Sequence, residues 1–327
     1  MKKIIILLLI SLFLTGCGTH SQNDVINDLD KKISNNSYNL EGNLEIVNND
    51  EVYNYDISVS YKKPDSYKVT LLNKANNHEQ IILKNSEGVF VATPALNKSF
   101  KFQSDWPYNN SQIYLLQSIV SDIKSDEKRE YKETDDGYTF ITNVNYPNNR
   151  KLVKQEVSIS KKGKIKEVKV KDENNVALMT MKFKNIDFNP TFKKDYFNLN
   201  TVMETVSTKE EETINLEDSI YPLVLPSGTK LKDEEKVAKT DGERVILTFE
   251  GEKPFILVEE TANVFDEFTV VPTSGEPYIL QDTIGILGDN SLSWTTGGVE
   301  YYIVSDVLNQ NELIEIASSI SSLPTMK

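Results

Sequence analysis

Apolar and polar residues alternate with a period of two through much of residues 38–187. In residues 52–61, for example, Tyr53, Tyr55 and Ile57 lie on one face and the polar residues between them on the other. Such alternation is typical of a strand with one face in water. Turn residues separate further segments of this kind, which follow in hairpin order and predict a long antiparallel meander. The expected strands are 38–45, 52–61, 67–73, 80–84, 88–92, 99–103, 138–144, 151–160, 165–171 and 177–187.

Two segments have helical spacing instead. Apolar residues follow one face of residues 24–33, and a wider apolar face covers residues 111–124. We expect the second helix to be buried against the concave side of the sheet and to plug it, which favours a packed interior over an open lipid pocket. The candidate plug residues are Ile113, Leu116, Ile119, Val120 and Ile123.

A charged run within residues 201–218 predicts a solvated linker, with an acidic docking strip as the alternative. Beyond it, residues 219–327 are expected to form a small α+β domain. Gly297-Gly298 predicts a two-residue hairpin turn in this domain. Its expected strands are 244–250, 255–260, 278–284, 285–287, 291–295 and 299–304, followed by a helix at 311–320.

The N-terminus begins with Lys2 and Lys3, then an apolar run from Ile4 to Leu14 that is too short to span a membrane. The closing Leu14-Thr15-Gly16-Cys17 resembles the lipobox of bacterial lipoproteins. This resemblance implies a signal peptide at 1–16 and a diacylglyceryl group on Cys17, at the start of a tether that spans 17–23. Acyl chains such as palmitate would hold the protein on the outer face of the cytoplasmic or forespore membrane. An ordinary secretory signal is the alternative.

The composition limits the kinds of partner and site that we expect. The net charge of −13 argues against nucleic acid as a partner. Cys17 is the single cysteine, so neither a disulfide within the chain nor a thiolate zinc site is expected. With His20 in the tether and His78 expected at the surface between strands, we anticipate no metal or other cofactor.

Paired carboxylates occur at Asp135-Asp136, Asp241-Gly242-Glu243 and Glu259-Glu260. Each pair is expected at a turn or strand end, without the apolar surroundings that raise a carboxyl pKa, so we predict that the protein is not an enzyme. Asp282, Asp289 and Asn290 are too sparse for a calcium loop.

Lys162, Lys164, Lys166 and Lys169 form a candidate basic patch. It is either a contact for a phospholipid headgroup or teichoic acid, or a plain solvated strand face.

The lipobox, the N-terminal helix, the meander, the helix announced by Trp106-Pro107-Tyr108 and the closing Asp195-Tyr196-Phe197-Asn198-Leu199 together resemble the LolA-like lipoproteins of spore-forming Firmicutes, of the GerS and YdcC type. The resemblance covers residues 24–200 and implies an α+β fold, a LolA/RseB-like half-barrel wrapped around helices. Residues 219–327 are similar to a domain of unassigned function in envelope lipoproteins.

The resemblance implies a non-catalytic scaffold that binds an envelope protein, such as a cortex amidase, during sporulation or germination. A lipid or lipoprotein carrier and an RseB-like sensor are the alternatives, and the carrier would need an accessible apolar cavity. Open sheet edges would also allow a homodimer.

Overall fold

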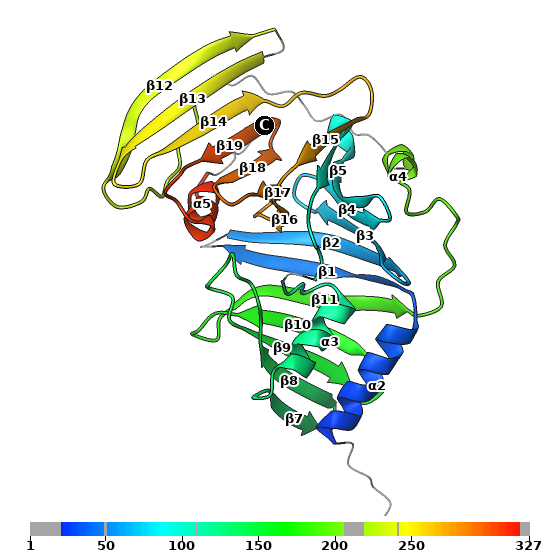
Figure 1. The fold of residues 1–327 in the computed structure, drawn as a ribbon. Coiled ribbons are helices and arrows are strands. Elements are labelled where there is room, and N and C mark those ends of the chain that lie inside the picture. Colours follow the sequence, from blue (N-terminus) through cyan, green and yellow to red (C-terminus); the bar gives the residue numbers. More distant parts are fainter. Residues whose placement is uncertain (1–20, 49–50, 109, 206–218, 241, 321–327) are drawn as a thin grey trace, which may run out of the picture.

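The computed structural model describes residues 21–48, 51–108, 110–205, 219–240 and 242–320. In this part of the chain, twelve strands form a first sheet in the order β15-β6-β5-β4-β3-β2-β1-β11-β10-β9-β8-β7 (Figure 1). Its strands are β1 (Tyr38–Asn48), β2 (Glu51–Lys62), β3 (Ser66–Asn73), β4 (Glu79–Asn85), β5 (Gly88–Thr93), β6 (Lys98–Phe102), β7 (Glu130–Thr134), β8 (Gly137–Asn143), β9 (Lys154–Ser160), β10 (Ile165–Lys171), β11 (Ala177–Asp187) and β15 (Thr269–Thr273).

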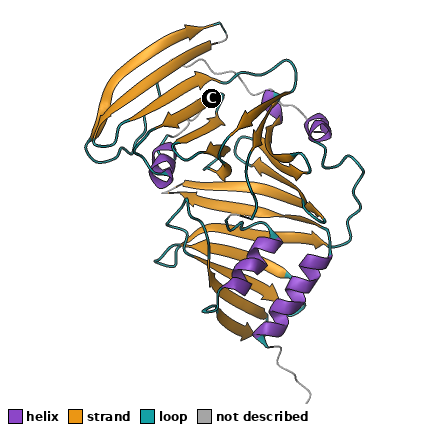
Figure 2. Cartoon of the chain, viewed as in Figure 1, coloured by secondary structure: helices purple, strands orange, loops and turns teal. Residues whose placement is uncertain are grey.

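Helices α2 (Gln22–Asn35) and α3 (Leu116–Ser125) lie against one face of this sheet (Figure 2). Their apolar faces enter a core that also contains the inward residues of β1–β3 and β8–β11. The Lys124 ammonium joins the helices by an ion pair of 2.6 Å to Asp30. The expected half-barrel wrapped around helices is confirmed.

A second sheet has the order β12-β13-β14-β19-β18-β17-β16 and carries helix α5 (Gln310–Ala317) on one face. Thr296 pairs with Val299 across Gly297-Gly298, whose positive φ angles of 57° and 75° suit a tight hairpin. The expected small α+β unit is therefore confirmed. Its strands are β12 (Thr229–Lys239), β13 (Gly242–Gly251), β14 (Phe255–Thr261), β16 (Glu276–Ile279), β17 (Ile284–Leu287), β18 (Ser291–Thr296) and β19 (Val299–Val304).

The two sheets are joined by more than a linker. Strand β15 comes from the C-terminal part of the chain, yet it pairs in parallel with β6 of the first sheet. Ile284 of β17 belongs to the core of the first sheet. Beside it, the buried Gln80 carboxamide of β4 accepts hydrogen bonds from the Ile284 N–H at 2.5 Å and the Thr283 hydroxyl at 3.0 Å.

A smaller apolar cluster covers the other face of β4 and β5. Helix α4 (Leu199–Thr205), a 3-10 turn at η1 (Pro94–Leu96) and the segment before α4 complete this region. Val202 and Met203 are buried in the cluster, so the start of the expected solvated linker is wrong. Residues 206–218 of that linker lie outside the described residues.

Two other expected boundaries are wrong. Helix α3 starts at Leu116, because the backbone of Leu115 before it is extended, with φ −102° and ψ 120°. The expected strand at 278–284 is broken by residues 280–283, where the Leu280 N–H donates to the Thr283 carbonyl in a turn. We call residues 280–283 the connector.

Candidate functional site

The concave face of the first sheet is filled by the candidate plug residues. Leu116, Ile119, Val120 and Ile123 lie on α3, and Ile113 lies in the segment that precedes it. All five side chains are at most 2% exposed. Space for a ligand has to be sought elsewhere in the described structure, and it occurs where the two sheets meet.

Two cavities lie on either side of the connector, and Leu280 and Gln281 line both. Bonds to both sheets fix the connector in place. The Tyr55 hydroxyl of β2 donates to the Gln281 carbonyl at 2.5 Å, and the Gln281 side chain donates to the Ser318 carbonyl after α5. The cavities are thus bounded by both units, and neither sheet alone would form them.

The first cavity, which we call the junction groove, has a volume of about 800 Å³. It runs between the end of β1, the β11 start, the 146–152 loop and α5. Its apolar lining includes Ile46, Ile113, Leu152, Leu178, Met179 and Ile314. Carboxamides line it as well, including Asn48, Gln112, Asn148, Asn149, Asn309 and Asn311. An apolar cleft with polar groups placed along it is typical of a binding site.

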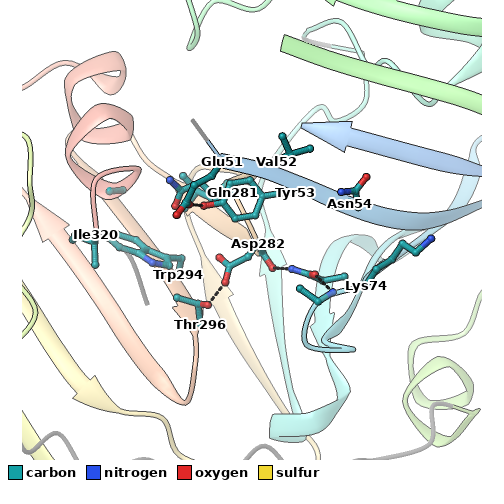
Figure 3. Close-up of a pocket in the computed structure, with 14 residues that line it drawn as sticks. Glu51, Val52, Tyr53, Asn54, Lys74, Gln281, Asp282, Trp294, Thr296 and Ile320 are labelled. Atoms are coloured by element: carbon teal, nitrogen blue, oxygen red, sulfur yellow. Dashed lines mark hydrogen bonds between the residues drawn. The ribbon is translucent and has the colours of Figure 1, made fainter. Parts of the chain in front are cut away.

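The second cavity, which we call the junction pocket, has a volume of about 820 Å³. Figure 3 shows Asp282 between the Tyr53 ring and Thr296, with Trp294 to one side. Trp294 is stacked on Tyr301 at 5.0 Å between ring centroids, which fixes its orientation.

Asp282 is the central polar group of the junction pocket. The Thr296 hydroxyl donates to its carboxylate, and the Asn73 side chain donates to its backbone carbonyl at 3.4 Å. Burial raises the pKa of the Asp282 carboxyl above its usual range, the Thr296 hydrogen bond and the nearby His78 imidazole lower it in part, and the Glu51 carboxylate adds a smaller increase. The sequence analysis considered Asp282 only as a calcium ligand and missed this site, because the pocket is formed by residues distant in the chain.

The candidate basic patch lies on the hairpin of β9 and β10. Lys162, Lys164 and Lys166 are exposed, whereas Lys169 is partly buried and pairs with Glu167 at 2.9 Å. Neighbouring lysines also face acids: Lys171 pairs with Glu156 at 2.6 Å. The positive charge is therefore concentrated at the hairpin tip.

The carboxylate pairs are placed differently from one another. Asp135 and Asp136 are exposed in a turn, as expected. Glu259 and Glu260 follow each other in β14 and so point to opposite faces of the sheet. Glu260 pairs with Arg244 at 2.6 Å, so the two glutamates cannot act as one acid/base pair. In the third group, Asp241 lies outside the described residues.

Glu259 contradicts the expectation that none of these carboxyls has apolar surroundings. Its side chain is fully buried, and burial raises its pKa to about 7. The Ile220 N–H donates to one carboxylate oxygen at 3.0 Å, and the other has no hydrogen-bond partner within the described chain. The sequence signal that could have indicated this burial is the alternation in β14, which places Glu259 on the same face as Phe255 and Leu257.

Three other expectations concern metals and the membrane. The described residues hold no cluster of three or more histidine, cysteine, aspartate or glutamate side chains suited to a metal ion. Within those same ranges, no helix has both the length and the apolar character needed to cross a bilayer. Cys17, the signal peptide and the first residues of the tether lie outside the described part of the chain.

Comparison with known proteins gives a family match. A family model described as sporulation protein YdcC-like matches residues 1–197. The sporulation protein YdcC of Bacillus subtilis (strain 168) is 38% identical over 321 residues, which cover 96% of this chain and 94% of that protein.

Solved structures are more distantly similar. Crystalline MucB is 14% identical, with 92% of this chain and 98% of that chain covered and a TM-score of 0.34. A chain of the complex between the CwlD amidase from Clostridioides difficile and the GerS lipoprotein is 19% identical, with coverage of 52% and 98% and a TM-score of 0.32. A LolA superfamily protein from Nitrosomonas europaea is 10% identical, with coverage of 54% and 98% and a TM-score of 0.31.

Proposed function

Because the chain belongs to the YdcC-like family of sporulation proteins, we propose that it is a lipid-anchored scaffold that binds a protein partner in the cell or spore envelope. In this proposal Cys17 carries a diacylglyceryl anchor, and the folded part lies on the outer face of the cytoplasmic or forespore membrane. The protein has no catalytic role of its own, and it supports the cortex-modifying machinery.

The filled concave face is the observation that carries this proposal. A carrier with a LolA-like cavity needs apolar space inside the half-barrel, but there α2 and α3 pack against the sheet. The accessible concave surface lies instead at the junction of the two sheets. A scaffold that presents a fixed cleft between two tied units fits this arrangement better than a carrier does.

The junction groove fits a polypeptide segment. Each carboxamide along it offers both a donor and an acceptor, which is what the peptide groups of an extended chain require. Its apolar lining would take the side chains between them. The partner is then an envelope protein, and the cortex amidase named by the sequence resemblance is the first candidate to test.

Site-specific photo-crosslinking in sporulating cells tests the proposal. A photoreactive residue at Asn148 or Glu315 lines the groove, and a matched one at Lys162 lies on the exposed β9–β10 hairpin. We expect one envelope protein to crosslink from both groove positions and not from Lys162. Crosslinks from all three positions to unrelated proteins would contradict the proposal.

The apolar lining of the groove keeps a lipid carrier as a second candidate. Native mass spectrometry of protein that lacks residues 1–17 separates the two. The scaffold is expected to be free of lipid, and a stoichiometric phospholipid adduct would favour the carrier.

Two genetic tests address the anchor and the role. A Cys17→Ala variant is expected to leave the membrane fraction, and retention there would contradict the lipid anchor.

A deletion strain is expected to form spores with abnormal cortex or germination. Normal spores would contradict the proposed support of cortex modification.

A further inference from the structure

The junction pocket is lined by two carboxylates whose charge its own residues offset incompletely. Asp282 and Glu51 both line it, and their hydrogen-bond donors are neutral: the Thr296 hydroxyl and the Tyr53 hydroxyl. The His78 imidazole lies close enough to lower the pKa of the Asp282 carboxyl, whereas no lysine or arginine of the described residues forms an ion pair with either carboxylate. Negative charge that is only partly offset is costly in a partly enclosed site.

The one lysine that lines the pocket is engaged elsewhere. The Lys74 ammonium lies 3.8 Å from the Asp56 carboxylate, and Figure 3 shows its side chain pointing away from Asp282. Asp56 also receives Lys184 at 3.3 Å. The charge at Asp282 thus remains available to a group that comes from outside.

The remaining walls suit an organic cation. The Tyr53 and Trp294 rings line the pocket, and aromatic faces attract ammonium and guanidinium groups. Leu280, Ala317 and Ile320 add apolar surface for an alkyl stem. The chain carries a net charge of −13, which draws positively charged groups toward it.

We propose that the junction pocket receives a lysine or arginine side chain of the protein partner, with its cation between Asp282 and Glu51 and its stem beside Trp294. This inference rests on the proposed function, and it names the chemistry by which the partner is recognised. The junction groove and the junction pocket, which share the connector as a wall, then hold two parts of one partner.

A titration with small probes tests the pocket without the partner. Full-length protein in detergent is titrated with N-acetyl-lysine methylamide and with the uncharged N-acetyl-norleucine methylamide, while NMR follows the Trp294 indole N–H. We expect the lysine probe to shift this signal at concentrations where the norleucine probe does not. Equal shifts with both probes, or none with either, would overturn the proposal.

Variants of the two carboxylates test whether they bind the cation of the lysine probe. Asp282→Asn keeps an acceptor for Thr296 and is expected to weaken lysine-probe binding about tenfold, since it removes a partly desolvated charge. Glu51→Gln, at an exposed position, is expected to weaken it less and guards against misfolding of the first variant. Asp136→Asn, in a distant exposed turn, is the control. Unchanged binding by both Asp282→Asn and Glu51→Gln would refute the site.

Photo-crosslinking from Glu315 then separates the two proposals. If the lysine probe binds but no partner crosslinks, the scaffold function fails and the cation site stands. If Asp282→Asn crosslinks the partner as efficiently as the wild type, the cation site fails and the scaffold function stands.

Discussion

Glu259 is a carboxyl group enclosed by the second sheet. On the inner face of β14 it lies between Val245 and Tyr301 of the neighbouring strands, and both of these side chains are buried. Its contact with the Ile220 N–H ties the start of the second unit to β14. A carboxyl in this position is more stable protonated than ionised, so its ionisation at higher pH destabilises the folded state.

Because the pKa of Glu259 is raised from 4.5 to about 7, the folded state holds a proton that the unfolded chain releases. Stability from this group is therefore complete below pH 4.5 and is lost as pH rises to about 7. We expect Glu259→Gln to match the wild type at pH 5 and to exceed it at pH 8 by on the order of 3 kcal/mol. Urea unfolding at both pH values measures this. A variant that is less stable at pH 8 would contradict it, and Asp136→Asn should have no effect.

Gln80 of β4 links the first sheet to β17 of the second by side-chain hydrogen bonds. Its buried carboxamide accepts from the Ile284 N–H at 2.5 Å and donates to the Ile284 carbonyl at 3.4 Å. Gln80→Leu should leave the Ile284 N–H buried without an acceptor and destabilise the protein by about 1–3 kcal/mol. Gln103→Leu, at an exposed position, is the control. Equal urea midpoints for the two variants would show that Gln80 does not tie the units.

At the level of elements, the sequence predicts best what is built from neighbours in the chain. The hairpins of β1–β6 and β8–β11 were predicted correctly, because their strands either alternate or, as in β4 and β5, are short apolar runs bounded by turn residues. Strands β7 and β12 were missed because both faces are largely exposed and charged residues break the alternation. Strand β15 was missed because it contains Pro272, which argues against a strand, and pairs with the distant β6.

The junction cavities could not be predicted from the sequence, for a similar reason. The residues that line them come from β1, β2, the connector and α5, which no local pattern brings together. Nothing in the sequence distinguishes Asp282 and Glu51 from other polar residues, because the pocket that they line forms where the two units meet. Helix α3, by contrast, could be predicted because the spacing of its apolar residues gives it a wide apolar face that has to be buried against another element.

Helix α3 should contribute strongly to stability through its buried face. Ile119 is fully buried between α2 and the sheet, so Ile119→Ala should cost about 2–5 kcal/mol through lost contacts and the cavity that remains. Ser121→Ala changes the exposed side of the same helix and serves as the matched control. Urea unfolding of both variants is the measurement. A loss below that of Ser121→Ala would mean that α3 does not pack as described.

On the scale of the whole molecule, the two units depend on each other. The second part of the chain supplies β15 to the edge of the first sheet, Ile284 to its core and the Glu300 carboxylate that pairs with Lys98 of β6. A parallel edge strand with a proline also shields β6 from pairing with another molecule. The N-terminal half-barrel is thus completed by the C-terminal part, although the sequence suggests two separate domains.

A fragment of residues 21–205 should therefore be less stable than the whole chain and should self-associate. Without β15, the β6 edge exposes unpaired backbone groups, and without residues 283 and 284 the Gln80 carboxamide loses the two donors that bond to its oxygen. We expect a lower urea midpoint and a concentration-dependent dimer in light scattering. A peptide of residues 262–287, added in trans, should reverse both effects by restoring β15 and β17. A monomeric fragment with the midpoint of the full chain would show instead that the half-barrel folds independently, and that the junction cavities form by docking of two finished domains.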